Sequence, residues 1–264
     1  MDNKRILAPI DLTQPGLRIL DSGTVDGLFL RSIQPLLAEP YTLLGYDVMK
    51  SFFSPTAPPH TTFGIHDIAK PWPAELQGTC DLVHQRFTIP GGTKTATARE
   101  IVGHLCRLVK PGGWIQLVEM DVTGTVHGPA MSDAWAATGA FLTAAGAGTD
   151  YAKSMAGWLK GEGFDNVSDH RVDLDVGARY PDAEWGVRAF TGVVGACKSE
   201  LNSLFYPAAV ADLRSLRFRL VMKLDVPDSV LKDLPERARK EMIERGGIYP
   251  LVFATGQKPA IYAT

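Results

Sequence analysis

Short apolar runs alternate with amphipathic stretches along this chain. The apolar runs predict strands at 17–22, 41–48, 62–66, 80–87, 114–121 and 248–255, and the turn at 161–164 predicts a further strand at 166–176. Apolar residues at helical spacing predict helices at 27–38, 95–109, 130–145 and 150–161, and two to four more within 181–246. The alternation of strands and helices up to about residue 120 is typical of a doubly wound α/β sheet with parallel strands.

The turn between the first strand and the first helix contains two glycines, Gly23 and Gly27. A residue without a Cβ atom permits a positive φ and a close approach of the backbone to a ligand. A turn of this kind predicts a site for an adenosine-containing cofactor. Val25 stands where a third glycine is expected, and its β-branched side chain reduces room and flexibility at the centre of the turn.

Acidic residues follow the next two predicted strands. Asp47 lies 24 residues after Gly23, near the offset of about 20 residues at which an acid meets ribose hydroxyls, and Val48 follows it. After the third strand, Asp67 could bind the adenine amino group and Ile68 could pack on the ring. The plainer alternatives are a surface acid at position 47 and a turn-capping acid at position 67.

The fourth predicted strand ends in three polar residues, His84, Gln85 and Arg86. Ligands of open parallel sheets bind beyond the carboxyl ends of the strands, so we expect these side chains to face the cofactor. His84 is the first candidate for a catalytic base and His127 is the second. For both histidines, a structural or substrate-orienting role is an equal alternative.

Candidates for substrate contacts lie in the second half of the chain. Glu119 and Asp121 end the fifth predicted strand and could orient a substrate. The helical region 181–246 carries aromatic residues, including Trp185 and Tyr206, and we interpret it as a pocket wall. Because aromatic residues at helical spacing more often belong to the core, this prediction concerns the segment more than its single residues.

Composition narrows the range of partners and compartments. The 264 residues carry a formal net charge of −2, which gives no electrostatic signature of nucleic-acid or membrane binding. Cys80, Cys106 and Cys197 lack disulfide or metal-ligand spacing, and the chain shows neither a signal core nor a long apolar run. We therefore expect a cytoplasmic protein without a metal, with a small-molecule partner and possible homodimers.

Five short motifs follow one another in a recognisable order. They are Ile19-Leu20-Asp21-Ser22-Gly23, Gly45-Tyr46-Asp47, Asp67-Ile68 with Pro71-Trp72-Pro73, Asp81-Leu82-Val83-His84-Gln85-Arg86, and Lys110-Pro111-Gly112-Gly113-Trp114. Together they resemble class I methyltransferases that depend on S-adenosylmethionine (SAM), most of all those of fungal secondary-metabolite pathways. The resemblance covers roughly 17–121, and it extends more weakly over nearly the whole chain.

The resemblance implies a Rossmann-like, doubly wound, seven-stranded sheet with an antiparallel last strand and a helical lid insertion. It implies one domain over 1–264, with a SAM-binding core at about 17–121 and a lid or substrate region at 130–162 and 181–246. Family members usually carry an N-terminal helical segment over the site. Only the short polar segment 1–16 precedes the first strand here, so we expect this cap to be missing or trimmed.

The resemblance also implies SAM as the cofactor and assigns its contacts. Asp47 and Val48 would lie at the ribose side, Asp67 and Ile68 at the adenine. The methionine side would meet Asp21, Ser22, Gly23 and Gly27, and the sulfonium would be bordered by His84, Gln85 and Arg86.

The resemblance implies in-line methyl transfer, which requires neither a metal nor a covalent intermediate. No Asn/Asp-Pro-Pro-aromatic motif follows the fourth strand, which argues against a nucleic-acid base as substrate. We expect methylation of a small-molecule secondary metabolite, on a hydroxyl oxygen. Two alternatives stay open: a cyclase or pericyclase that keeps the fold without transferring methyl, and a non-catalytic regulatory partner protein.

Overall fold

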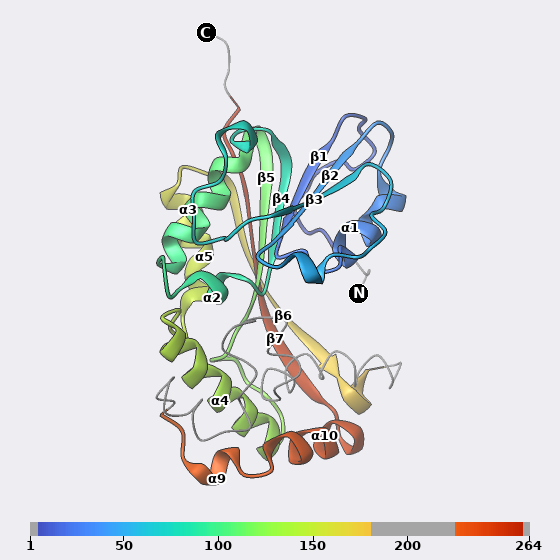
Figure 1. Ribbon diagram of the computed structural model, residues 1–264. Coiled ribbons are helices and arrows are strands. Elements are labelled where there is room, and N and C mark those ends of the chain that lie inside the picture. Colours follow the sequence, from blue (N-terminus) through green and yellow to red (C-terminus); the bar gives the residue numbers. More distant parts are fainter. Residues whose placement is uncertain (1–4, 181–224, 261–264) are drawn as a thin grey trace. The chain divides into compact units, whose positions relative to one another are not determined.

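The computed structural model describes residues 5–180 and 225–260 (Figure 1). The chain falls into two compact units. The first comprises Met1–Glu119, Ala152–His170 and Val252–Thr264, and the second comprises Met120–Tyr151 and Arg171–Leu251. The two predicted helices of 130–162 divide between the units, so the single domain and its lid stay predictions.

Seven strands in the described part of the chain form one mixed sheet, with the order β3-β2-β1-β4-β5-β7-β6. They are β1 (Arg18–Ser22), β2 (Thr42–Asp47), β3 (Thr61–Ile65), β4 (Cys80–Arg86), β5 (Val109–Met120), β6 (Asp165–Val176) and β7 (Gly247–Gln257). The first five strands pair in parallel, and the last strand of the chain is antiparallel. The predicted Rossmann-like sheet is confirmed.

The helices of the first unit cover both faces of its strands. The helix α1 (Leu28–Ile33) lies on one side, and α3 (Ala98–Leu108) and α5 (Tyr151–Gly161) lie on the other (Figure 1). A short helix, α2 (Ile89–Gly92), and the 3-10 turn η3 (Ala74–Leu76) complete the connections on either side of β4. The start of α3 is fixed by a capping box, in which Thr97 and Glu100 satisfy each other's backbone N–H groups.

The core under α1 explains why β1 is central. Alternate residues of a strand face opposite sides, and Ile19 joins Leu43 and Leu82 in an apolar cluster beneath this helix. The segment before β1 also packs here, since Ala8 is buried and Gln116 of β5 accepts hydrogen bonds from the N–H groups of Leu7 and Ala8 at 2.6 and 3.2 Å. The segment expected to be polar thus contributes to the core.

Two predicted boundaries were wrong for physical reasons. The helix predicted at 27–38 ends at Ile33 and continues as the 3-10 turn η1 (Gln34–Leu36), because Pro35 lacks the N–H that an α-helix needs. The strand predicted at 114–121 begins at Val109, so residues 110–113 lie within β5, where Gly112 and Gly113 exchange backbone hydrogen bonds with Lys258. The extra residues cause a register irregularity between β4 and β5.

The connection from β2 to β3 contains little regular structure. It carries the 3-10 turn η2 (Lys50–Phe52), followed by the proline-rich loop 54–60. Phe53 of this connection stacks on Phe63 of β3, with ring centroids 5.1 Å apart. The connection therefore packs against the sheet through an aromatic contact and not through a helix.

The second unit is built around α4 (Pro129–Ala145) and α10 (Leu234–Glu244), with the short elements η4 (Gly177–Arg179) and α9 (Asp228–Leu231). The carboxylate of Glu241, which is 8% exposed, accepts hydrogen bonds from the N–H groups of Ala130 and Met131 at 3.1 and 2.9 Å. These donors belong to the first turn of α4, where backbone N–H groups lack helical partners and favour a negative charge.

Replacing Glu241 with alanine should lower the stability of the second unit by about 2–3 kcal/mol, because two buried N–H groups lose a charged acceptor. Thermal unfolding followed by circular dichroism measures the loss. Glu244→Ala is the control, since Glu244 lies on the same helix, its side chain is 53% exposed, and its ion pair with Lys240 is long, at 3.9 Å. Equal losses for the two variants would contradict this role of Glu241.

Candidate functional site

The carboxyl ends of three adjacent parallel strands bring most of the predicted site residues together. Asp21 of β1 pairs in register with Gly45 of β2 on one side and with His84 of β4 on the other. The turn 23–27 leaves β1 at this edge, and Asp47 ends β2 beside it. In an open parallel sheet this edge is where ligands bind.

The two predicted glycines of the turn have left-handed backbones, with φ of 77° at Gly23 and 79° at Gly27. The space that a Cβ atom would need is filled by the protein itself. A Cβ on Gly23 would lie 1.9 Å from Cγ2 of Thr88, and one on Gly27 would lie 2.8 Å from the ring of Phe63. The structure therefore supplies a packing reason for both glycines, and close approach of a cofactor to them stays a prediction.

Val25 keeps the backbone shape of the glycine that it replaces. Its φ is 52°, in the left-handed region that a β-branched residue rarely adopts, at a cost of about 1–2 kcal/mol. The N–H of Val25 donates to Oδ2 of Asp47 at 3.0 Å. The irregularity seen in the sequence is thus a strained residue that an acid of the neighbouring strand holds in place.

Asp47 is buried, with 7% of its surface exposed, so the alternative of a surface acid is wrong. Its other oxygen, Oδ1, accepts hydrogen bonds from the N–H groups of Val48 at 2.7 Å and Met49 at 3.4 Å. The pKa of Asp47 is raised above its usual value, mainly because the carboxyl group is buried. The nearby Asp21 carboxylate adds to this shift, and the three backbone N–H groups oppose it. Val48, the predicted neighbour of the cofactor, is 53% exposed.

Asp67 and Ile68 follow β3 and lie half-buried. Oδ1 of Asp67 accepts a hydrogen bond from the N–H of Ala69 at 3.0 Å, and Oδ2 lies 3.8 Å from Nζ of Lys70. The turn-capping alternative therefore describes Asp67 in this structure. Contacts of Asp67 and Ile68 with adenine stay predictions.

His84 is enclosed by protein. Its side chain is 3% exposed, its Nδ1 lies 2.7 Å from Oδ1 of Asp21, and its ring stacks on Phe29 with centroids 3.6 Å apart. Burial lowers the pKa of His84, against the opposing influence of Asp21. A neutral imidazole that donates Nδ1–H to a buried carboxylate has the geometry of an orienting residue, because a base must reach the proton that it removes.

Gln85 and Glu119 form a second buried pair at the ends of β4 and β5. Nε2 of Gln85 donates to Oε1 of Glu119 at 2.6 Å and to Oγ1 of Thr88 at 3.0 Å. The same Glu119 oxygen accepts from the N–H of Ile89 at 3.0 Å. Both side chains are fully buried, so Glu119, predicted to orient substrate, holds the loop after β4 in this structure. Ser22, which pairs in register with Gln85, is buried, whereas Arg86, the next residue of β4, is exposed.

Two of the remaining predicted residues, Asp121 and His127, belong to the second unit. Oδ1 of Asp121 accepts from the N–H and hydroxyl of Thr123 at 3.0 and 2.7 Å, and Oδ2 lies 3.4 Å from Arg171. Asp121 is therefore a buried turn residue, and His127 is exposed. Trp185 and Tyr206 lie outside the described residues.

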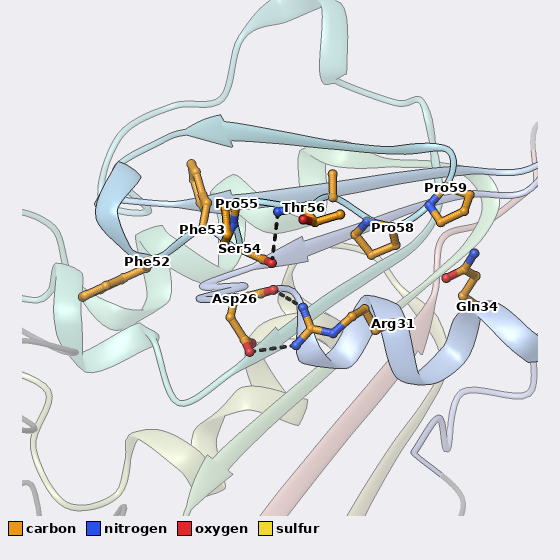
Figure 2. Close-up of a pocket in the computed structure, with 11 residues that line it drawn as sticks. Asp26, Arg31, Gln34, Phe52, Phe53, Ser54, Pro55, Thr56, Pro58 and Pro59 are labelled. Carbon is orange, nitrogen blue, oxygen red and sulfur yellow. Dashed lines mark hydrogen bonds and ion pairs between the residues drawn. The ribbon is translucent and has the colours of Figure 1, made fainter.

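A cavity of about 850 Å³ lies against α1 and the connection from β2 to β3 (Figure 2). Asp26, Arg31 and Gln34 line one side, and the aromatic and proline residues of 52–59 line the other. The sequence analysis did not predict this cavity. The prolines of 54–60 do explain why a loop, and not an α-helix, forms this wall of it. Within 5–180 and 225–260, no cluster of three His, Cys, Asp or Glu side chains could hold a metal ion.

Known proteins resemble this chain over nearly its whole length. It is 32% identical to methyltransferase psoC of Aspergillus fumigatus over 259 residues, which cover 98% of this chain and 89% of the relative. N-methyltransferase sirN of Leptosphaeria maculans is 38% identical over 189 residues, 70% of this chain and 66% of the relative. No family model matches. The chain belongs to the class I SAM-dependent methyltransferases, and it groups with those of fungal secondary metabolism.

Solved structures support the fold. Phosphoethanolamine N-methyltransferase 2 of Haemonchus contortus, bound to S-adenosylhomocysteine, matches with a TM-score of 0.51 and 13% identity over 94% of this chain and 50% of that one. A methyltransferase-like protein of Bacillus halodurans matches with a TM-score of 0.50 and 12% identity, covering 95% and 96% of the two chains.

This chain is thus a methyltransferase enzyme with SAM as its cofactor. None of its described helices is long and apolar enough to cross a membrane.

The lowered pKa of His84 predicts a loss of stability in mild acid. Below about pH 6.5 the unfolded chain takes up a proton that folded His84 resists, so stability falls as the pH falls, by at most about 1.4 kcal/mol per pH unit. Thermal unfolding between pH 7.5 and 5.5 measures this slope. His84→Asn, which keeps a donor for Asp21, should flatten the slope; equal slopes would show that His84 does not cause it.

Proposed function

We propose that this methyltransferase transfers the methyl group of SAM to a nitrogen atom of a small-molecule secondary metabolite. The supporting observation is its similarity to relatives named N-methyltransferases, such as sirN at 38% identity and gliN of Aspergillus fumigatus at 33%. O-methylation, expected from the sequence, stays a prediction that the same experiment tests.

The environment of His84 supports nitrogen as the acceptor atom. A hydroxyl becomes a good nucleophile when a base removes its proton, and His84 is enclosed between Asp21 and Phe29. A neutral amine attacks through its lone pair and loses its proton afterwards. The enzyme then has to hold the nitrogen in line with the methyl group, which positioning alone accomplishes.

The residues at the edge of the sheet fit SAM in their chemistry. Asp21 and Asp47 supply two buried carboxylates beside the turn 23–27. Asp47 already accepts three backbone N–H groups, and an ionised carboxylate has about four acceptor sites, which leaves capacity for a ribose hydroxyl. The negative charge of Asp21 suits the cationic methionine end. SAM supplies a methyl group on positively charged sulfur.

The remaining predicted residues of the first unit have places in this proposal. Gly23, Gly27 and Ser22 form the backbone of the methionine side, and the exposed Val48 together with Asp67 and Ile68 borders the adenosine. We assign positioning roles to His84 and Gln85. His84 orients Asp21, and Gln85 orients Glu119, at this edge of the sheet. Arg86, which is exposed, is a candidate for a substrate contact. The roles predicted for His127 and Asp121 stay predictions.

Asp47→Asn should weaken SAM binding about 10- to 100-fold, because the amide loses the charge and one acceptor oxygen that ribose hydroxyls and Val25 share. Isothermal titration calorimetry with SAM and S-adenosylhomocysteine measures the effect. Asp175→Asn is the control, since Asp175 is an exposed acid paired with Arg179. Unchanged affinity in Asp47→Asn would remove Asp47 from the cofactor site.

The reaction itself is tested with SAM labelled in its methyl group and a panel of small amines, amides and phenols. The proposal expects a product heavier by one labelled methyl, which NMR places on nitrogen. A label on oxygen would replace N- by O-methylation. An isomer of unchanged mass would favour the cyclase alternative.

A further inference from the structure

Asp26 and Arg31 form an ion pair that joins the turn after β1 to the helix α1. Nη2 of Arg31 lies 2.7 Å from Oδ2 of Asp26, and Nη1 donates to the backbone oxygen of the same residue (Figure 2). The other carboxylate oxygen of Asp26 accepts the N–H of Leu28 at 3.0 Å. One arginine thus binds both the backbone and the side chain of a single turn residue, and we call this contact the Asp26–Arg31 clamp.

The exposure of the clamp argues against a role in global stability. The side chains of Arg31 and Asp26 are 36% and 50% exposed, and ion pairs with such exposure contribute little to the stability of a protein. Its geometry is nevertheless specific, because a planar guanidinium that donates to two acceptors fixes orientation as well as distance. The effect of the clamp should therefore be local, on the shape of the turn.

The residue before the clamp needs such a restraint. Val25 has a φ of 52°, and a β-branched residue strongly prefers a negative φ. Two anchors hold it in this shape: Asp47 accepts its own N–H, and Arg31 binds the next residue. A strained backbone persists where its surroundings over-determine it, so loss of one anchor should let the turn relax to another shape.

We propose that Arg31 is a positioning residue for SAM binding, which it supports by keeping Val25 in a glycine-like conformation. This inference rests on the proposed cofactor site at the turn 23–27. Preorganisation of a binding loop raises affinity because the ordering is complete before the ligand arrives. The clamp thus compensates for the missing third glycine of the turn.

The test is a double-mutant cycle of Arg31→Met and Val25→Gly, read by SAM affinity and by the KM for SAM and kcat. In the Val25 background, Arg31→Met should weaken SAM binding about 10-fold and raise the KM for SAM, with kcat at saturating SAM changed less than about 2-fold. In the Val25→Gly background the same change should cost less than about 3-fold, because glycine adopts a positive φ without strain.

A matched control and a second variant guard against general damage. Arg179→Met removes an exposed arginine whose ion pair with Asp175 has the same 2.7 Å length, and it should leave SAM affinity and melting temperature unchanged. Asp26→Asn keeps an acceptor for the N–H of Leu28, loses the ion pair, and should weaken SAM binding in the same direction as Arg31→Met.

The outcomes separate this proposal from the proposed function. If wild-type protein binds SAM, Asp47→Asn weakens that binding and Arg31→Met does not, the clamp proposal is wrong and the cofactor site stands. Equal costs of Arg31→Met in both backgrounds would also overturn it, because the clamp would then act independently of Val25. If wild-type protein binds no SAM, the proposed function and the clamp's role are both wrong.

Discussion

The hydrogen bond between Asp21 and His84 joins the ends of two central strands, and the geometry of the candidate site depends on it. Residues Ile19 to Ser22 of β1 are buried between β2 and β4, so the carboxylate at position 21 has little access to water. A buried charge is costly without a partner, and the neutral imidazole supplies a donor in a fixed orientation. The turn that would hold SAM starts two residues further along the chain.

The other polar residues of this edge follow the same principle. Gln85 and Glu119 bind each other and the start of α2, and Asp47 binds the turn that it faces. His84 and Glu119, which the sequence predicted to act on protons or substrate, thus form their hydrogen bonds with other groups of the protein. The chemistry that remains for them is the presentation of negative charge and of a preformed turn to a cationic cofactor, and methyl transfer from SAM needs little more.

The sequence was sufficient for the order of elements but not for the partners of polar side chains. Apolar runs of strand length located six of the seven strands in the described part of the chain, because burial is a local property of the pattern. The mostly exposed β6 was located from the glycine turn that precedes it. The pairing of His84 with Asp21 joins residues 63 apart and depends on strand register. Lys258, which binds the start of β5, lies 149 residues from Val109, so the local sequence at 110–113 did not indicate a strand. The early end of α1 could have been predicted, since Pro35 stands inside the predicted helix 27–38.

The contact between Gly23 and Thr88 bears on what a glycine motif can tell. The methyl group of Thr88 occupies the place of the missing Cβ, so any larger residue at position 23 would push the loop after β4 away from β1. Selection for folding alone would retain this glycine in a descendant that had stopped transferring methyl groups. In this fold Gly23 is therefore evidence of common descent and of packing, and evidence for catalysis has to come from other residues.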